Sequence, residues 1–226
     1  MTSMPFYVAP EQQIQDRADF ARKGIARGRS VVVQQYADGI CCVAENRSSL
    51  LYKISEIYDR ICFAGVGRYN EFAQLRTAGI RHADMRGYAY AREDVTARGL
   101  ANAYAQLLGG IFSGAEKPYE VELIVAELGM EPEHDEIFQI GFDGSLTDQE
   151  CFAVMGGEAQ RILGEISDRH DPSASLSEAV QSATLALFGG EPVDPVLLEI
   201  GVLDRTGDQR RKFRRLATEQ IPALLA

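Results

Sequence analysis

The dipeptide Asp38-Gly39 separates two apolar runs, SVVVQQYA and ICCVAEN. Asp-Gly between runs rich in β-branched residues is a strong signal for a β-hairpin whose tight turn has positive φ at both central positions. A strand pair usually opens a globular domain directly, yet here a polar helical segment stands in front of it. The fold of this chain therefore has to place a helix immediately before its first strand pair.

The helical segment covers residues 10–27. Pro10 suits a first helical turn, where a missing N–H costs nothing, and Gly28 suits the end of a helix. Apolar residues recur along the segment at helical spacing and form a narrow stripe, which consists of Ile14, Ala18, Ala21 and Ile25. The pattern predicts a surface helix with one narrow packing face.

The remaining pattern alternates strands with pairs of helices. A strand at 61–66 precedes two helices, and Asp94 is the expected N-cap of the second. Three strand runs follow as a meander: VELIVAEL, EIFQIGF and a run that ends in CFAVMGG. Two further helices, one with a capping box at Ser175 and Glu178, lead to the strand LLEIGVLD and a short terminal helix. We expect one α+β domain, a four-layer αββα sandwich of two antiparallel sheets between helix pairs.

The overall charge limits the classes of partner. The net charge is -10, which argues against nucleic acid because phosphate binding needs a local excess of Lys and Arg. The one basic cluster is expected to be a solvated edge or a protein interface; it consists of Arg210, Arg211, Lys212, Arg214 and Arg215. No run is long enough for a membrane span, and the N-terminus does not read as a secretory signal. With four cysteines expected as buried free thiols, a cytoplasmic location is the prediction.

Motifs for cofactor or metal chemistry are weak. The Gly65-Val66-Gly67 sequence lacks the third glycine of a dinucleotide-binding turn, since residue 70 is Asn, so tight strand-to-helix packing is the expected role. None of His82, His134 and His170 has a second His or Cys at metal-ligand spacing, and we expect neither a metal nor a cofactor. Solvated charge is expected of the acids near Pro132, which are Glu131, Glu133, Asp135 and Glu136.

Several separated passages resemble one family. They are RSVVVQQYADGICCVAEN, LYKISEIYDR, RGYAYAREDVTARGLAN, KPYEVELIVAE and FAVMGG. Together they are similar to the α-type subunit of the actinobacterial 20S proteasome, over essentially the whole chain from Met4 to Leu225. The resemblance implies the N-terminal-nucleophile hydrolase fold with an extra N-terminal helix, and assembly into seven-membered rings. In that family the α rings cap the barrel, while the inner β rings carry the proteolytic threonines.

The resemblance also implies what the active-site positions hold. A threonine peptidase of this fold needs Thr at a free N-terminus, because its own α-amino group serves as the base. This chain has Arg29 and Ser30 there, behind a helix, and Glu45 where a catalytic subunit has Asp. Lys53 corresponds to the lysine that lines the pocket for the C-terminal carboxylate of an activating ATPase. An ammonium suits a terminal carboxylate because it acts as a point charge.

Two segments are expected to control the axial pore. Residues 1–9 correspond to the gate, although they lack the Tyr-Asp-Arg motif of archaeal and eukaryotic relatives; they are Met1, Thr2, Ser3, Met4, Pro5, Phe6, Tyr7, Val8 and Ala9. Lys117, Pro118 and Tyr119 resemble the Arg-Pro-Tyr loop that narrows the pore. The resemblance assigns ring contacts to the helical stripe of Ile14, Ala18, Ala21 and Ile25, and makes 30–226 the sandwich.

The expected function is that of a non-catalytic outer-ring subunit of the 20S core particle. Its expected partners are copies of itself in a seven-membered ring, a proteasome β subunit, a ring-forming AAA ATPase and unfolded, pupylated proteins. An alternative is an active hydrolase of the same fold, released by processing near Gly28. A stand-alone small-molecule enzyme is a third class, and no cofactor motif supports it.

Overall fold

Two five-stranded antiparallel sheets form the centre of the molecule in a computed structural model, which describes residues 9–114 and 117–226. The first sheet has the order β10 (Phe213–Arg215), β9 (Leu198–Asp204), β2 (Gly39–Glu45), β1 (Val31–Tyr36) and β8 (Phe152–Met155). The second has the order β3 (Ile54–Tyr58), β4 (Ile61–Gly67), β5 (Val121–Glu127), β6 (Glu136–Ile140) and β7 (Leu146–Gln149).

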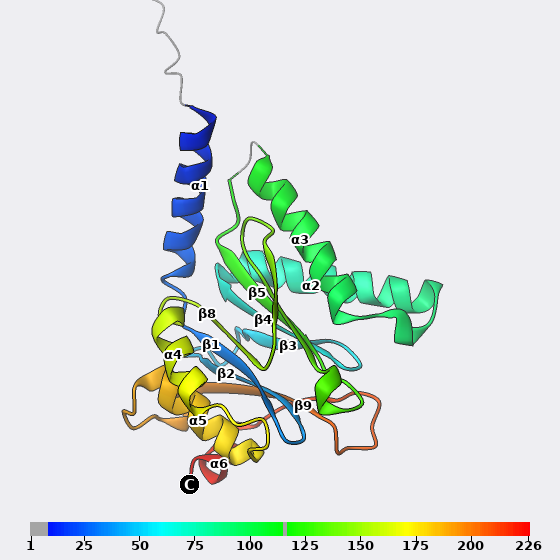
Figure 1. Ribbon diagram of the computed structural model, residues 1–226, viewed down its shortest axis with the longest axis vertical. Helices are drawn as coiled ribbons and strands as arrows, with labels where there is room; N and C mark the ends of the chain where they lie inside the picture. The colour runs from blue at the N-terminus through cyan, green and yellow to red at the C-terminus, as the bar shows by residue number, and fades with distance from the viewer. Residues whose placement is uncertain (1–8, 115–116) are drawn as a thin grey trace, which may run out of the picture.

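Helices cover the outer face of each sheet (Figure 1). The second sheet is covered by α2 (Tyr69–Ala89) and α3 (Ala97–Ser113), and the first by α4 (Ala159–Arg169) and α5 (Leu176–Phe188). The short α6 (Ile221–Leu225) packs on α5, and α1 (Pro10–Ile25) extends from one end of the sandwich. This arrangement confirms the predicted α+β class with two antiparallel sheets between helix pairs.

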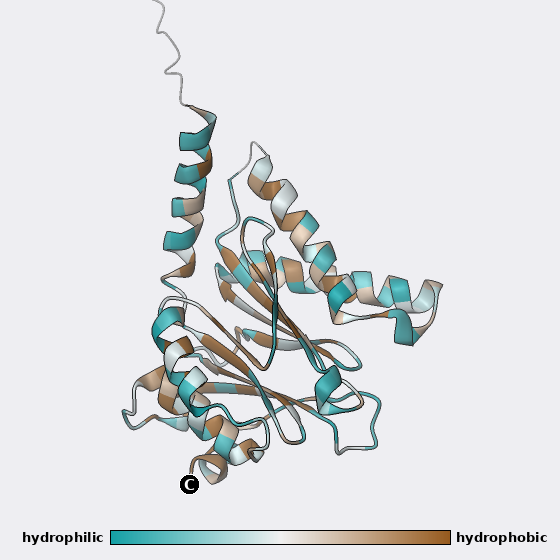
Figure 2. Cartoon of the chain, in the orientation of Figure 1, coloured by the Kyte–Doolittle hydropathy of each residue, from teal (hydrophilic) through white to brown (hydrophobic). Residues whose placement is uncertain are grey.

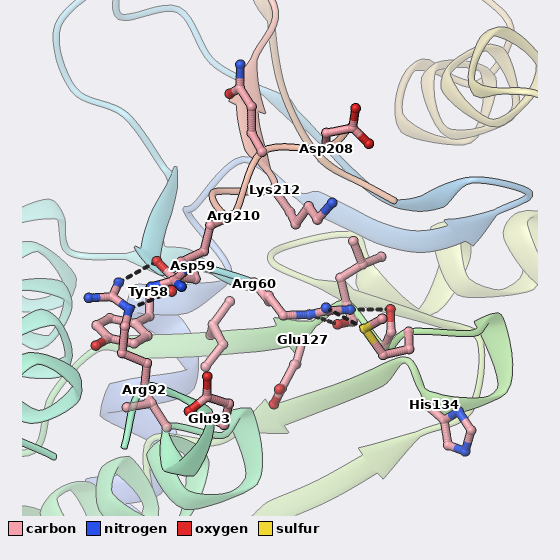
Figure 3. Close-up of a pocket in the computed structure, with 16 residues that line it drawn as sticks. Tyr58, Asp59, Arg60, Arg92, Glu93, Glu127, His134, Asp208, Arg210 and Lys212 are labelled. Atoms are coloured by element: carbon pink, nitrogen blue, oxygen red, sulfur yellow. Dashed lines mark hydrogen bonds and ion pairs between the residues drawn. The ribbon is translucent and has the colours of Figure 1, made fainter. Parts of the chain in front are cut away.

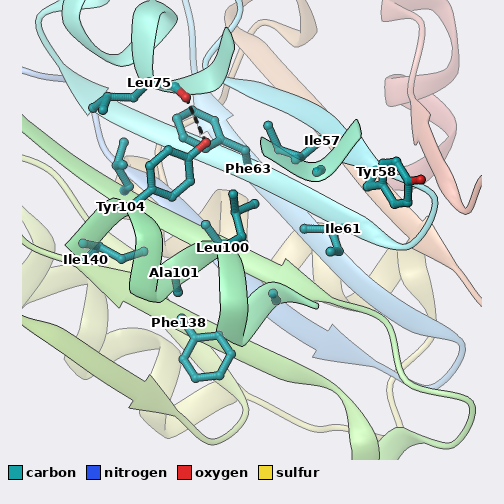
Figure 4. Close-up of a cluster of buried hydrophobic side chains, with 14 of the residues drawn as sticks. Ile57, Tyr58, Ile61, Phe63, Leu75, Leu100, Ala101, Tyr104, Phe138 and Ile140 are labelled. Atoms are coloured by element: carbon teal, nitrogen blue, oxygen red, sulfur yellow. Dashed lines mark hydrogen bonds between the residues drawn. The ribbon is translucent and has the colours of Figure 1, made fainter. Parts of the chain in front are cut away.

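The core has three layers because both faces of each sheet are covered. Ile54, Cys62 and Ile124 belong to the cluster between the sheets. Leu100 and Tyr104 of α3 belong to the cluster on the second sheet, where the Tyr104 hydroxyl donates to the Leu75 carbonyl at 3.0 Å (Figure 4). The third cluster joins the first sheet to α4 and α5. All six residues of β1 are buried, which explains why its sequence lacks polar alternation.

The predicted hairpin is present, but its turn differs from the prediction. β1 pairs with β2 from Val31 opposite Ala44 to Tyr36 opposite Gly39. Among the residues that the structure describes, only glycines have positive φ, so the expected left-handed Asp38 is wrong. Gly39 has φ 157° and lies in the ladder, where a Cβ would collide with the Leu203 carbonyl of β9. The two residues between the strands are Ala37 and Asp38, one position earlier than predicted, and the close approach of β9 rather than the turn requires Gly39.

Other predicted boundaries also need correction. Thr96 caps α3, since its hydroxyl accepts the Gly99 N–H at 3.1 Å, whereas the Asp94 carboxylate accepts the Ala91 N–H one turn earlier. The third run of the expected meander divides in two: β7 pairs with β6 and continues the meander, whereas β8 crosses to the other sheet and pairs with β1. The pattern also does not predict β3 and β10, the short strands at one edge of each sheet.

Candidate functional site

The start of β1 lies inside the chain, directly behind α1. The connection is fixed by backbone hydrogen bonds from the Gly28 N–H to the Ile25 carbonyl at 2.8 Å and from the Gly157 N–H to the Gly28 carbonyl at 3.2 Å. Ser30 is buried, and its hydroxyl lies 3.4 Å from the Glu158 N–H. The nitrogen of residue 30 is therefore a peptide nitrogen in a packed turn, so it cannot act as an α-amino base.

Lys53 reaches this turn from the other sheet. It directly precedes β3, and its ammonium donates to the Arg29 carbonyl at 2.6 Å. Burial lowers the pKa of Lys53 to about 8. The charges of Glu199 and Glu45 partly oppose that shift, and the guanidinium of Arg29 adds to it. The side chain thus holds its positive charge at neutral pH in a setting that penalises the charge.

Glu199 fixes the backbone on both sides of Lys53. This buried carboxylate of β9 accepts the Lys53 and Ile54 N–H groups, each at 2.9 Å, and the Asn46 amide at 2.6 Å. It also pairs with the guanidinium of Arg215. Glu199 is not among the site residues expected from the sequence. The signal for it is an acidic residue within the apolar run LLEIGVLD.

A cavity of about 260 Å³ lies beside this turn, and Arg27, Arg29, Glu45 and Glu158 are among the residues that line it. The Glu45 carboxylate lies 3.2 Å from the Arg29 guanidinium and 3.4 Å from that of Arg47. Arg27 is exposed at the cavity wall. The cavity wall therefore carries charges of both signs, with Lys53 held against Arg29 on one side of the turn.

The segment predicted to narrow the pore is attached to α1 and α2. The Lys117 ammonium lies 2.7 Å from the Glu71 carboxylate and 2.8 Å from that of Glu120. Pro118 is buried, and the Tyr119 hydroxyl lies 3.4 Å from the Gln74 side chain. The three predicted residues thus lie together in the fold and contact the body of the chain.

Comparisons with known proteins agree on one family. The family model described as proteasome subunit matches residues 25–192. A protein named proteasome subunit alpha from a Nocardioides species is 59% identical over 228 residues, covering 99% of this chain and 89% of that protein. The chain belongs to the proteasome subunit family. Relatives with the same name include one from Kineococcus radiotolerans, 54% identical over 99% of this chain and 98% of the relative. One from Acidothermus cellulolyticus is 56% identical at the same coverages. The resemblance to actinobacterial α-type subunits is thereby confirmed.

In this α-type chain, part of the apolar stripe of α1 is buried and part is exposed. Ala18, Ala21 and Ile25 are buried by the chain's own residues, whereas Ile14 is 56% exposed. Figure 2 shows the outer turns of α1 mostly hydrophilic, with isolated brown positions. Of the four predicted ring-contact residues, Ile14 is thus the one left open to a neighbour.

The predicted gate falls almost wholly outside the described residues. Residues 1–8 are not described, and of the nine predicted gate residues only Ala9 is placed. Ala9 is exposed, and its carbonyl accepts the Gln13 N–H at 3.1 Å at the start of α1.

A larger cavity, of about 600 Å³, lies beside the turn between β3 and β4 (Figure 3). The Arg92 guanidinium bonds both oxygens of Asp59, at 2.9 and 2.6 Å, and stacks on the Tyr58 ring. Arg60 donates to the Leu128 carbonyl at 2.7 Å. These three charged side chains are thus held by one another or by the backbone, while Glu93, Glu127 and His134 also line the wall.

Within residues 9–114 and 117–226, no three His, Cys, Asp or Glu side chains are grouped so that they could hold a metal ion. None of the helices described there is both long and apolar enough to cross a bilayer.

Proposed function

We propose that this α-type subunit is a non-catalytic component of the outer ring of the 20S proteasome core particle. The observation that carries the proposal is the packed turn before β1, where Arg29 and Ser30 occupy the positions of a nucleophile and its amino group. Without a terminal threonine, Lys53 and Glu45 have no nucleophile to activate. The proteolytic activity of the particle then belongs to β subunits.

Lys53 and the arginines of the neighbouring cavity wall form the proposed docking site for a ring ATPase. A C-terminal carboxylate is the matching ligand, because the Lys53 ammonium offers donors beyond the one given to Arg29. Arg27 adds an exposed guanidinium at the cavity wall. Glu199 supports the site by holding the backbone of residues 53 and 54.

The outer ring is proposed to control which polypeptides reach the inner chamber. Residues 1–9 serve as the gate, and they precede α1, which extends from one end of the sandwich (Figure 1). Ile14 contributes apolar area to a contact with a neighbouring copy. In this proposal the substrates are unfolded, pupylated proteins, the particle acts in the cytoplasm, and its other partners are the β subunit and the AAA ATPase.

Co-expression with a β subunit from the same source tests the assembly. Electron microscopy is expected to show stacked seven-fold rings with this chain in the outer positions. Deleting residues 1–9 is expected to speed peptide hydrolysis by the assembled particle. The chain in an inner ring, or no ring at all, would overturn the proposal.

The docking role is tested with a peptide that ends in the carboxyl terminus of the ATPase. Lys53→Ala is expected to abolish its binding to the particle. Lys23→Ala serves as the matched control, because Lys23 is an exposed lysine of α1. Equal binding by the two variants would refute the assignment of Lys53.

A further inference from the structure

A balanced cluster of charges lies where the segment before β5 meets α1 and α2. The side chains of Glu71 and Glu120 are only 9% and 11% exposed, and both carboxylates contact the Lys117 ammonium. The Arg68 guanidinium lies 3.8 Å from Glu71 and 3.6 Å from Glu120. Two carboxylates thus face two cations. Burial alone would lower the pKa of Lys117, but its bonds to Glu120 and Glu71 outweigh that effect and raise the pKa.

Glu71 also holds the backbone of this segment. It is the third residue of α2, and its second oxygen accepts the Glu120 N–H at 2.7 Å. The Glu120 carbonyl in turn accepts the Arg68 N–H at 2.9 Å. At Gly67, which has φ 111°, a Cβ would collide with the same carbonyl. One carboxylate at a helix N-terminus therefore binds both the side chain of residue 117 and the main chain of residue 120.

The helix α1 packs directly on the cluster. The Phe20 ring faces the Lys117 ammonium at 5.3 Å, within the range of a cation–π contact. A Cβ on Gly24 would collide with the Glu120 side chain. The contacts of Phe20 with Lys117 and of Gly24 with Glu120 thus couple the position of residues 117–120 to that of α1.

We infer that Glu71 is the positioning residue that fixes the 117–120 segment against α1 and α2, and that Lys117, whose side chain is 39% exposed, serves as the cationic partner in this anchor. This inference rests on the proposed role of the segment in narrowing the pore. Its physical basis is that releasing the ammonium would leave two nearly buried carboxylates without their main partner, and breaking a buried charge pair in this way is strongly unfavourable.

Hydrogen exchange on the isolated chain tests the anchor without requiring rings. Glu71→Ala is expected to speed exchange of the Glu120 amide by about tenfold or more, because the amide loses its acceptor. Glu71→Gln, which keeps an acceptor and loses the charge, is the milder variant if the first does not fold. Glu127→Ala is the matched control: Glu127 also accepts a backbone N–H at a helix start, that of Ala97 at 2.6 Å.

The assembled particle tests the consequence for the pore. The ratio of unfolded casein degradation to tripeptide hydrolysis is expected to change at least about twofold in Glu71→Gln and in Lys117→Gln, with the double variant no worse than either because they break one unit. The conservative variant Lys117→Arg is expected to keep the wild-type ratio of casein degradation to tripeptide hydrolysis. Glu127→Ala is expected to lower stability and leave the ratio unchanged.

Unchanged exchange at Glu120 in Glu71→Ala would overturn the anchor, whether or not rings form. An equal change of the casein-to-tripeptide ratio in Glu127→Ala would also overturn it, since general destabilisation would then explain the effect. Failure of the wild-type chain to form seven-fold rings would instead refute the proposed function, and the exchange measurement would still decide the inference.

Discussion

At the scale of single residues, Lys53 and Glu199 show how distant parts of the chain set the properties of a site. The Lys53 ammonium is half-buried against Arg29, and Glu199 holds its backbone from 146 residues further along the chain. The position of Lys53 is predictable by resemblance to the family. Its lowered pKa is not, because desolvation arises only when the strands around it are packed.

Carboxylate docking at Lys53 is expected to weaken in mildly alkaline solution. Because the folded-state pKa is about 8, binding of the ATPase C-terminal peptide should fall about tenfold for each pH unit above that value. The ordinary value is 10.5, so the unfolded chain binds the proton more tightly between pH 8 and 10.5, and this group's contribution to stability rises with pH there. Peptide titrations between pH 6 and 9 measure the effect, and Lys53→Arg, which stays charged, should show no such loss.

Glu199→Ala is expected to lower the free energy of unfolding by about 3 kcal/mol, because it leaves the Arg215 guanidinium and two N–H groups without their acceptor. Glu56→Ala breaks the pair with Arg211, whose side chain is 72% exposed, and should cost far less because solvent screens that pair. Urea denaturation of the isolated chain measures both. Equal losses would contradict the structural role of Glu199.

At the scale of elements, one apolar stripe of α1 has two proposed roles, packing within the chain and contact with a neighbouring copy. Helical spacing predicts the stripe correctly, but spacing cannot tell contacts within the chain from contacts with a neighbour. The structure makes that division, because the inner turns of α1 pack against β4 and β5 while Ile14 lies further out. The hairpin shows the same limit. The pairing of its strands follows from local sequence, yet the requirement for glycine at residue 39 depends on the neighbouring strand β9.

Two substitutions in α1 are expected to separate these roles. Ala21→Leu should destabilise the isolated chain by about 1–3 kcal/mol, since Ala21 is fully buried and the site has no room for three more carbons. Ile14→Ser should change the stability of the isolated chain by about 0.5 kcal/mol or less, because Ile14 is exposed. Native mass spectrometry is expected to show weaker ring assembly for Ile14→Ser. Intact assembly with Ile14→Ser would remove Ile14 from the ring contact.

At the scale of the whole molecule, the two sheets bring the candidate site together. The turn before β1 belongs to the first sheet, whereas Lys53 leads into the second, and the 3.7 Å approach of the Cys42 and Cys62 sulfurs shows how closely the sheets pack. The crossing of β8 to pair with β1 completes the first sheet and places Gly157 against the turn. An apolar strand run does not indicate which sheet it joins, so this step could not be predicted.

The assembled chain is expected to keep the residues before Gly28. The bonds around Gly28 and the burial of Ser30 protect the turn from cleavage, because a protease needs an extended, accessible backbone. Intact-mass measurement of the chain from purified particles checks this, together with peptidase assays of the isolated chain, which should show no activity. A chain shortened to begin near residue 29, with new peptidase activity, would support the alternative of a processed hydrolase.

The sequence by itself determined the α+β class, the hairpin behind a helix and the absence of threonine at the start of β1, because these depend on residue order and local periodicity. Only the tertiary structure decided the lowered pKa of Lys53, the contacts of the Lys117 ammonium with Glu71 and Glu120, and the central place of Glu199. These properties come from desolvation and from hydrogen bonds between segments far apart in the chain, which local pattern does not encode.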